Sequence, residues 1–190
     1  MNWETKRKLV EAYDKITYRR KPFLRILDFS PEPPFLDVGC GGGQNCKILR
    51  EVICLDISVK QLTDAREHGC NFLVNADMEF LPFRDESFST LLYMASLHHL
   101  DDTKTAIHEA KRVLKEGGKI MATIWSSNVR MSFVKSTSSG ERYFRLYYPG
   151  ELKKEMERSG FETIHDEEFE RLSNLNEFYV GRKRRESKSI

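Results

Sequence analysis

Long apolar runs are absent from this chain of 190 residues. No segment approaches the roughly 20 apolar residues that a membrane-spanning helix needs. The opening residues, MNWETKRKLV, also lack the apolar run of a secretory signal peptide. We therefore expect a cytoplasmic protein that does not enter a membrane.

Cysteine is scarce, and neither sign of charge is in large excess. The four cysteines, Cys40, Cys46, Cys54 and Cys70, lack the paired CxxC spacing of a zinc site, so we expect reduced thiols in a core and no bound metal. The formal net charge is +2, so basic residues matter for binding only where they cluster. A hydrophobic share of 39% in a chain of this length suits one packed domain.

Apolar segments alternate with amphipathic segments from Phe35 onward. Strands are predicted at FLDVGC, VICLDI, NFLVNAD, FSTLLYMA and GKIMATIWS, with helices between them, one of which has Ser58 as its cap. This rhythm predicts an α/β fold, in which a mostly parallel sheet is covered by helices on both faces. Near the end, GELKKEMERSG predicts a helix, and FETIHDEEF with NEFYVGRKR predicts a hairpin. Before the core, two short helices are expected around a basic elbow at Thr17–Pro22.

A glycine-rich stretch, FLDVGCGGGQN, follows the first predicted strand. The dinucleotide fingerprint GxGxxG requires a third glycine, but that position is Gln44 or Cys46 in the two possible registers. Asp37 lies inside the strand, where its carboxylate repels a pyrophosphate but attracts the ammonium group of a methionine. The loop therefore favours S-adenosylmethionine (AdoMet) over a dinucleotide.

Two further acids end the second and third predicted strands. An acid at Asp56 can accept both hydroxyl groups of a ribose. Asp77 can accept from the exocyclic amine of adenine, with Met78 and Leu81 on the two sides of the ring. Each acid alone also fits a helix cap or a turn, but all lie at the carboxyl ends of strands, where parallel sheets bind ligands.

These segments together resemble a known family. LDVGCGGG, CLDIS, NADMEFLPFRDESFS and ASLHHL with EAKRVLKEGGKIMATIW are similar to the motifs of Rossmann-like class I AdoMet-dependent methyltransferases over residues 5–181. The resemblance implies a seven-stranded sheet of order 3-2-1-4-5-7-6 with an antiparallel last strand. It also implies one methyltransferase domain over residues 1–190, with a helical arm at 1–30, a core at 34–181 and a basic tail at 182–190.

The acceptor is indicated by the segments after the fourth strand. MASLHHL lacks the Asn/Asp-Pro-Pro-Tyr signature of enzymes that methylate planar amines. RYFRLYYPGEL, with YDKI, YRRKPF and HHLDD, resembles the methyltransferases that esterify the 5-carboxymethyl group of the wobble uridine of transfer RNA. A carboxylate needs orientation by cations rather than a strong base, and the candidate catalytic residues are His98, Arg142 and Arg145.

The resemblance and the motifs assign the remaining site residues. Those expected to bind AdoMet are Arg19, Asp37, Gly39, Cys40, Gly41, Asp56, Ile57, Asp77, Met78 and Met94. Those expected to contact the RNA are Arg20, Lys21, His99 and Tyr143. Basic residues near both ends (Lys6, Arg7 and Lys8; 182–185 and Lys188) would contact phosphates if both ends lie beside the cofactor crevice.

The resemblance also implies a heterodimer. Members of this family work with a small zinc-binding activator protein that adds a strand to the edge of the methyltransferase sheet. The edge is expected at residues 71–77, with Phe72, Leu73 and Val74 at the interface. Two alternatives stay open: a methyltransferase of quinones or other small metabolites, and a non-catalytic scaffold with the same fold.

Overall fold

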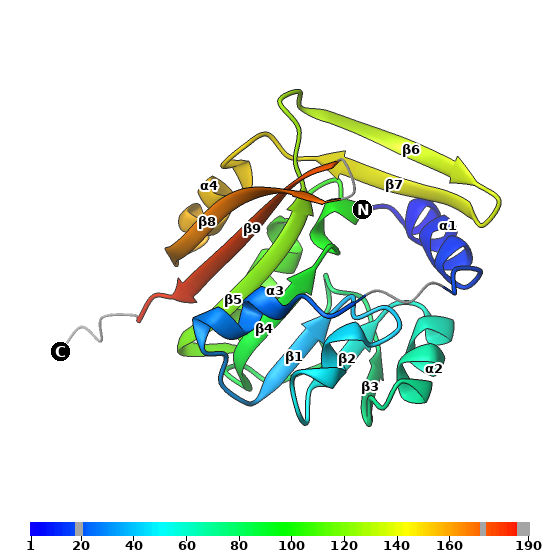
Figure 1. Ribbon diagram of the computed structural model, residues 1–190. Helices are drawn as coiled ribbons and strands as arrows, with labels where there is room; N and C mark the ends of the chain where they lie inside the picture. The colour runs from blue at the N-terminus through cyan, green and yellow to red at the C-terminus, as the bar shows by residue number, and fades with distance from the viewer. Residues whose placement is uncertain (18–20, 172–173, 186–190) are drawn as a thin grey trace.

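The computed structural model describes residues 1–17, 21–171 and 174–185. Its central sheet has seven strands in the order β3-β2-β1-β4-β5-β9-β8 (Figure 1). The strands are β1 (Phe35–Val38), β2 (Ile53–Asp56), β3 (Phe72–Asn75), β4 (Phe88–Met94), β5 (Leu114–Trp125), β8 (Phe161–Arg171) and β9 (Asn174–Lys183). The first five are parallel, and β9 is antiparallel to both β5 and β8. Because β8 and β9 are the sixth and seventh strands of this sheet, the expected order 3-2-1-4-5-7-6 is confirmed.

The helices cover both faces of the sheet. The α-helices are α1 (Trp3–Tyr13), α2 (Val59–Glu67), α3 (Lys104–Val113) and α4 (Glu151–Arg158), and the 3-10 helices are η1 (Leu24–Phe29), η2 (Gln44–Lys47) and η3 (Leu97–His99). Ser58 begins α2 as expected, since its hydroxyl accepts from the Gln61 N–H at 3.1 Å. Among the described residues, no helix has the length and apolar composition needed to cross a membrane.

Two hydrophobic clusters form the core, one on each face. Side chains of a strand alternate between them: Leu91 and Tyr93 of β4 pack with α3 and α4, whereas Leu92 and Met94 pack with α2 and η1. Burying a large apolar side chain stabilises the fold by about 1.5–3 kcal/mol. The parallel strands are apolar on both faces because helices cover both.

A two-stranded ribbon was not predicted by the sequence. β6 (Met131–Thr137) and β7 (Gly140–Leu146) pair with each other and not with the central sheet. Phe144 of β7 is buried and stacks on Trp125, with ring centroids 4.6 Å apart. The RYFRLYY segment, which was expected to carry acceptor residues, is part of this ribbon, and the period of two in β7 places Phe144 inward.

Two of the cysteines correct the expectation of four reduced thiols. Cys46 and Cys70 form a disulfide, with Cα atoms 5.5 Å apart, while Cys40 and Cys54 are buried free thiols. The sequence could not show this pair, because 24 positions separate the two residues and only the packing of α2 against β2 brings them together.

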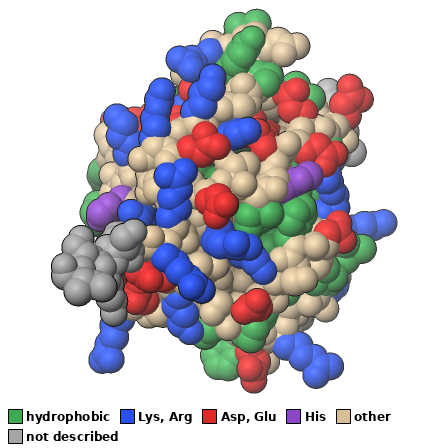
Figure 2. All heavy atoms as spheres, turned by 90° about the vertical axis from the view of Figure 1, so that its left-hand side faces the viewer, with side chains coloured by type: hydrophobic (Ala, Val, Ile, Leu, Met, Phe, Trp, Pro, Cys, Tyr) green, Lys and Arg blue, Asp and Glu red, His purple; other side chains and the backbone are tan. Residues whose placement is uncertain are grey.

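The two described ends of the chain lie at opposite ends of the strands of the sheet (Figure 1). Lys183, at the end of β9, donates to the Leu114 carbonyl at the start of β5, whereas α1 lies beside the carboxyl ends of the parallel strands. The expectation that both basic ends border the crevice is therefore wrong for residues 182–185. On the face that carries α4, β8 and β9, Lys and Arg side chains alternate with Asp and Glu (Figure 2).

Candidate active site

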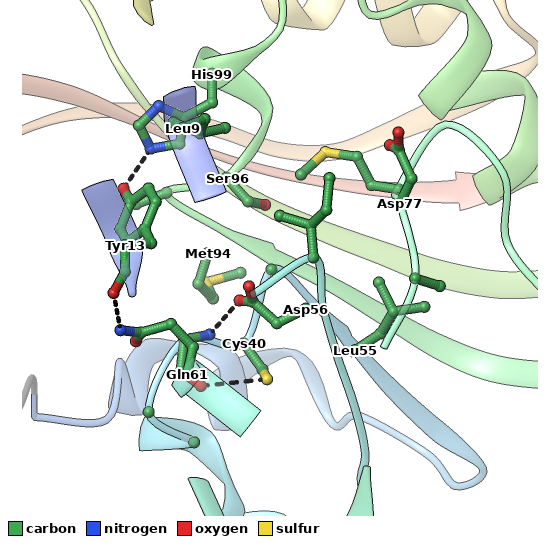
Figure 3. A pocket seen from close by; sticks show the side chains of 18 of the residues that line it. Leu9, Tyr13, Cys40, Leu55, Asp56, Gln61, Asp77, Met94, Ser96 and His99 are labelled. Carbon is green, nitrogen blue, oxygen red and sulfur yellow. Dashed lines mark hydrogen bonds between the residues drawn. The ribbon is translucent and has the colours of Figure 1, made fainter. Parts of the chain in front are cut away.

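A pocket opens at the carboxyl ends of β1, β2, β3 and β4 (Figure 3). It is lined by the glycine turn 39–43, by Asp56 and Ile57, by Ala76, Asp77 and Met78, by Met94, Ala95 and Ser96, and by Met1, Lys6, Leu9 and Tyr13 at the amino-terminal end. Eight predicted cofactor residues thus meet here: Gly39, Cys40, Gly41, Asp56, Ile57, Asp77, Met78 and Met94. Arg19 lies outside the described residues, and so do Arg20 and Lys188.

The glycine turn borders the pocket with backbone. The N–H groups of Gly39 and Cys40 donate to the Leu55 carbonyl at 2.8 and 3.1 Å. Gly39 has a φ of +72°, and a Cβ there would lie 2.6 Å from the Ser96 Cβ. Only glycine fits this position, for both conformational and steric reasons.

Asp56 is held by backbone donors. Its Oδ2 accepts from the Gly41 N–H at 2.8 Å, and its Oδ1 accepts from the Ser58 N–H at 2.9 Å. Burial raises the pKa of Asp56 to about 6, although these N–H groups oppose the shift. The carboxylate also lines the pocket, where its remaining lone pairs can accept from the hydroxyl groups of a ribose.

Asp37 lies behind the turn and is not one of the pocket-lining side chains. It is fully buried; its Oδ2 accepts from the Asn45 amide at 3.0 Å, while its Oδ1 has no hydrogen-bond partner among the described residues. Burial raises the pKa of Asp37 to about 7. A buried carboxylate with one unpartnered oxygen is costly by itself, and it suits a cationic group of a ligand.

Asp77 contacts a residue that sequence reasoning placed elsewhere. Its Oδ2 lies 2.5 Å from the Lys6 Nζ of α1, and the same Nζ lies 2.6 Å from Glu79 Oε2. Lys6 is buried within this pair of acids, so the expectation that it contacts phosphate is wrong. The Met1 ammonium is 3.3 Å from Glu79, so the amino-terminal end of α1 lies against the loop that carries Asp77 and Glu79.

The other end of α1 is bonded to η3 and to α2. Tyr13 Oη lies 2.6 Å from His99 Nε2, and His99 Nδ1 lies 2.9 Å from the Tyr143 carbonyl. Since a carbonyl can only accept, His99 carries a proton on Nδ1, and in the neutral ring its Nε2 accepts from the Tyr13 hydroxyl. The Gln61 amide donates to the carbonyls of Tyr13 and Ile16, at 2.8 Å each.

The three candidate catalytic residues, His98, Arg142 and Arg145, have different surroundings in the structure. Arg142 stacks on the rings of Tyr13 and Phe144 at 5.6 and 5.5 Å, and its buried Nε has no hydrogen-bond partner among the described residues. Arg142 does not line the pocket itself, but it lies over Tyr13, which does.

His98 and Arg145 are not brought to the pocket. His98 Nδ1 accepts from the Trp125 N–H at 3.3 Å beneath the aromatic stack. Arg145 is paired with Glu151 at 2.9 Å and Glu155 at 2.5 Å, so its charge is already compensated. Neither residue is among those that line the pocket, and the contacts that the structure shows for each are structural.

The remaining residues are those expected to contact RNA and those pocket residues that the sequence did not indicate. Lys21 is exposed, and Tyr143 is half-buried with its carbonyl on His99. Sequence reasoning missed Lys6, Tyr13, Gln61 and Ser96 as pocket residues. The sequence carries one signal for these residues, the amphipathic spacing of α1. This spacing predicts that one face of the helix is buried, but it does not indicate which segment that face packs against.

The fold and this pocket define a Rossmann-like protein that binds an amino-acid-bearing nucleoside. The fit to AdoMet rests on the glycine turn, on the ribose acceptor Asp56 and on the unpartnered Asp37 oxygen behind the turn. When bound, AdoMet supplies an electrophilic methyl group on a sulfonium centre.

Comparisons with known proteins agree with this assignment. The methyltransferase-domain family matches residues 36–122. A protein of Encephalitozoon cuniculi that is named as a methyltransferase is 32% identical over 170 residues, which cover 78% of this chain and 80% of that protein. The chain belongs to the class I AdoMet-dependent methyltransferases.

Other relatives are longer. A Mus musculus protein named tRNA methyltransferase 9B is 33% identical over 57% of this chain and 25% of its own length. The tRNA (carboxymethyluridine(34)-5-O)-methyltransferase of Arabidopsis thaliana is 35% identical over 48% and 24%, respectively. The chain spans 49% and 59% of two Methanocaldococcus jannaschii proteins that it also matches.

Solved structures share the fold. A SAM-dependent methyltransferase from Methanosarcina mazei superimposes with a TM-score of 0.76 at 20% identity, covering 88% of this chain and 100% of that chain. A chain from the complex of the Haloferax volcanii Trm112 methyltransferase activator with a methyltransferase has a TM-score of 0.64 at 15% identity, over 80% and 82%.

Replacing Gly39 with Ala should abolish cofactor binding. The new Cβ would be strained at positive φ and would collide with Ser96, so we expect AdoMet affinity to fall more than about tenfold by calorimetry. Gly69→Ala is the matched control, because Gly69 also has a positive φ but nothing within 4 Å of its Cβ position. It should cost about 1 kcal/mol of stability and leave the affinity unchanged. Equal affinities in the two variants would remove Gly39 from the cofactor site.

Asp37→Asn should change how stability depends on pH. The pKa of Asp37 rises from its ordinary value to about 7 on folding, so the folded state binds the proton more tightly than the unfolded state. The free energy of unfolding therefore falls as pH rises from about 4 to about 7, by up to about 1.4 kcal/mol per pH unit for one group. The variant should show a shallower fall in urea titrations and weaker AdoMet binding at neutral pH.

Asp102→Asn is the control for this slope, since Asp102 is exposed. An unchanged slope in Asp37→Asn would show that the Asp37 carboxyl does not take up a proton on folding.

Proposed function

We propose that this methyltransferase esterifies the 5-carboxymethyl group of the wobble uridine in transfer RNA. The observation that carries the proposal is Arg142, a guanidinium with a buried, unpartnered Nε that stacks on the pocket residue Tyr13. An arginine in this position suits an anionic acceptor, because its planar fork can bind both oxygens of a carboxylate.

The acceptor chemistry matches the groups that surround it. A carboxylate with an ordinary pKa near 4 is ionised at neutral pH, so it attacks without a general base. The chain must orient it in line with the methyl group and exclude water. Arg142 orients the carboxylate, and α1 covers the pocket through the contacts of Lys6 and Tyr13.

His99 acts as a positioning residue in this proposal. Its Nδ1–H donates to the Tyr143 carbonyl, so in the neutral ring its Nε2 accepts from the Tyr13 hydroxyl. This contact holds the Tyr13 ring beneath Arg142 and thereby sets the position of the guanidinium.

Two relatives of this chain are named for transfer RNA methylation, and this similarity supports the proposed substrate class. The chain matches about a quarter of the length of each relative. The contacts of α1 with the pocket also support one domain over 1–190, with the helical arm as part of the site. Lys21 is the described basic residue that we assign to the RNA backbone.

The stability of the methylated product in alkali identifies the acceptor group. Transfer RNA from cells that lack the enzyme, incubated with the purified chain and methyl-labelled AdoMet, should gain label that mild alkali releases as volatile methanol. Arg142→Ala should lower turnover by about 100-fold, as expected for a lost charge-assisted hydrogen bond to the reacting group, and should spare AdoMet binding. Arg66→Ala removes an exposed arginine of α2 and should change neither.

Other outcomes identify other functions. Alkali-stable label would indicate methylation of nitrogen or carbon. Label in a small-metabolite extract but not in RNA would favour the small-molecule alternative. AdoMet binding without any transfer would indicate the scaffold.

We infer that the partner adds a strand to β3. β3 is an edge strand that pairs only with β2, and Phe72 is 50% exposed on it. Leu73 and Val74 each pack against one of the two core clusters. An exposed apolar edge of this kind favours pairing with another chain, and the Haloferax volcanii structure that shares this fold contains an activator.

Phe72→Asp should prevent co-purification with a small zinc-binding activator, because it places a charge at the centre of the proposed interface. Val74 is a poor test position, since it also packs against the core. Val134→Asp is the control, as Val134 is 55% exposed on β6 and lies on another surface. Co-purification of Phe72→Asp at the level of the control would exclude the β3 edge.

A further inference from the structure

All four cysteines of the chain gather beneath the glycine turn. Cys40 lies in the turn and lines the pocket, Cys46 lies in η2, Cys54 lies in β2, and Cys70 directly precedes β3. The sulfur atoms of Cys46, Cys54 and Cys70 lie within 4.8 Å of one another. Nothing in the methyl-transfer chemistry uses these side chains.

The four sulfurs form a chain of neighbours. Cys46 and Cys70 are joined as a disulfide, and Cys54 Sγ lies 3.0 Å from Cys46 Sγ. The neighbouring Cys54 thiol and burial raise the pKa of the Cys40 thiol well above its ordinary value. The partly exposed Cys46 is the member that a small thiol can reach first.

This chain of sulfurs supports the turn directly. A Cβ at Gly43, which has a φ of +75°, would collide with Cys70 Sγ. Cys40 Sγ lies 3.4 Å from the Gly41 carbonyl. The disulfide therefore links the helix that follows the turn to the segment that packs beneath it, and limits how far the turn can open.

We propose that the four cysteines form a thiol–disulfide exchange site whose state sets the affinity of the pocket for AdoMet. With the Cys46–Cys70 bond intact, the turn is held in the conformation that binds the cofactor. Once the bond is reduced, the turn opens more often and the affinity falls. Reduction by two molecules of a small thiol transfers two electrons and two protons to the disulfide, and the small thiols become oxidised to their own disulfide.

Cys54 is the thiol that exchanges with the Cys46–Cys70 disulfide. Cys54 loses its proton and its sulfur attacks Cys46 Sγ; the Cys46–Cys54 bond forms, the Cys46–Cys70 bond breaks, and the departing Cys70 sulfur takes up the proton. This isomerisation consumes no oxidant or reductant. It frees Cys70 from η2 without reducing the chain.

A metal ion bound by the same sulfurs is the competing occupant. The disulfide argues against it, because two of the three clustered sulfurs are bonded to each other and cannot both act as thiolate ligands. The sulfurs lie in a row that extends through Cys54 to Cys40. A row of sulfurs suits thiol–disulfide exchange better than it suits a metal site, in which the ligands surround one ion.

The test measures disulfide state and AdoMet affinity on the same samples. The purified full-length chain is equilibrated in glutathione buffers from reducing to oxidising, alkylated, and mapped by mass spectrometry, while calorimetry gives the affinity for AdoMet. We expect the form with the Cys46–Cys70 disulfide to bind AdoMet about tenfold more tightly than the reduced form. This ratio corresponds to a tenfold difference in the fraction of molecules whose glycine turn has the conformation that binds AdoMet. The Cys46→Ser/Cys70→Ser double variant should bind weakly in every buffer.

Cys54→Ser isolates the exchange step. It should keep the redox response and the Cys46–Cys70 pair, but lose the minor Cys46–Cys54 pair that the wild-type chain should show. If the double variant does not fold, the wild-type comparison in the two buffers still decides. Equal affinity in the mapped oxidised and reduced forms would overturn the proposal, as would free thiols at Cys46 and Cys70 in every buffer. Tight binding of one zinc or cadmium ion per reduced chain would replace it with a metal site.

Discussion

The N–H groups of Gly39 and Cys40 both donate to the carbonyl of Leu55, and the N–H of Gly41 donates to the Asp56 carboxylate. These bonds fix a turn with positive φ at the end of β1, and they use the end of β2 to do so. The adjacent Ser96 after β4 leaves no room for a side chain at Gly39. Three neighbouring parallel strands thus determine one backbone conformation, and the cofactor pocket exists because that backbone, rather than side chains, forms its floor.

Two buried acids accompany the turn at a cost to stability. Asp37 is fully buried with one unpartnered oxygen, and Asp56 is nearly buried with backbone donors on both oxygens. Burial raises the pKa of each, to about 7 and about 6. A group that is unfavourable in the folded chain alone can become favourable when a cation or a set of hydroxyl groups binds beside it. A ligand that binds beside these acids therefore offsets part of the free energy that their burial costs the folded chain.

α1 contacts two sides of the pocket. Its Lys6 pairs with Asp77 and Glu79 on one side, and its Tyr13 is hydrogen-bonded to His99 on the other. The Tyr13 ring of the same helix also packs against the Arg142 guanidinium. Its amino-terminal charge is compensated by Glu79 and Asp101, which gives the helix a fixed position over acids from two separate loops.

The sequence by itself determined the α/β class, the strand order through its resemblance, and the local cofactor pattern at Asp37, Gly39, Asp56 and Asp77. These features depend on residues that are close together in the chain, where spacing and period carry the information. Only the tertiary structure decided that Tyr13 and Lys6 join the pocket, that His98 and Arg145 do not, and that Cys46 is bonded to Cys70. Each of these depends on which side chains meet across the fold, and that is set by packing between distant segments, which the local pattern of residues does not record.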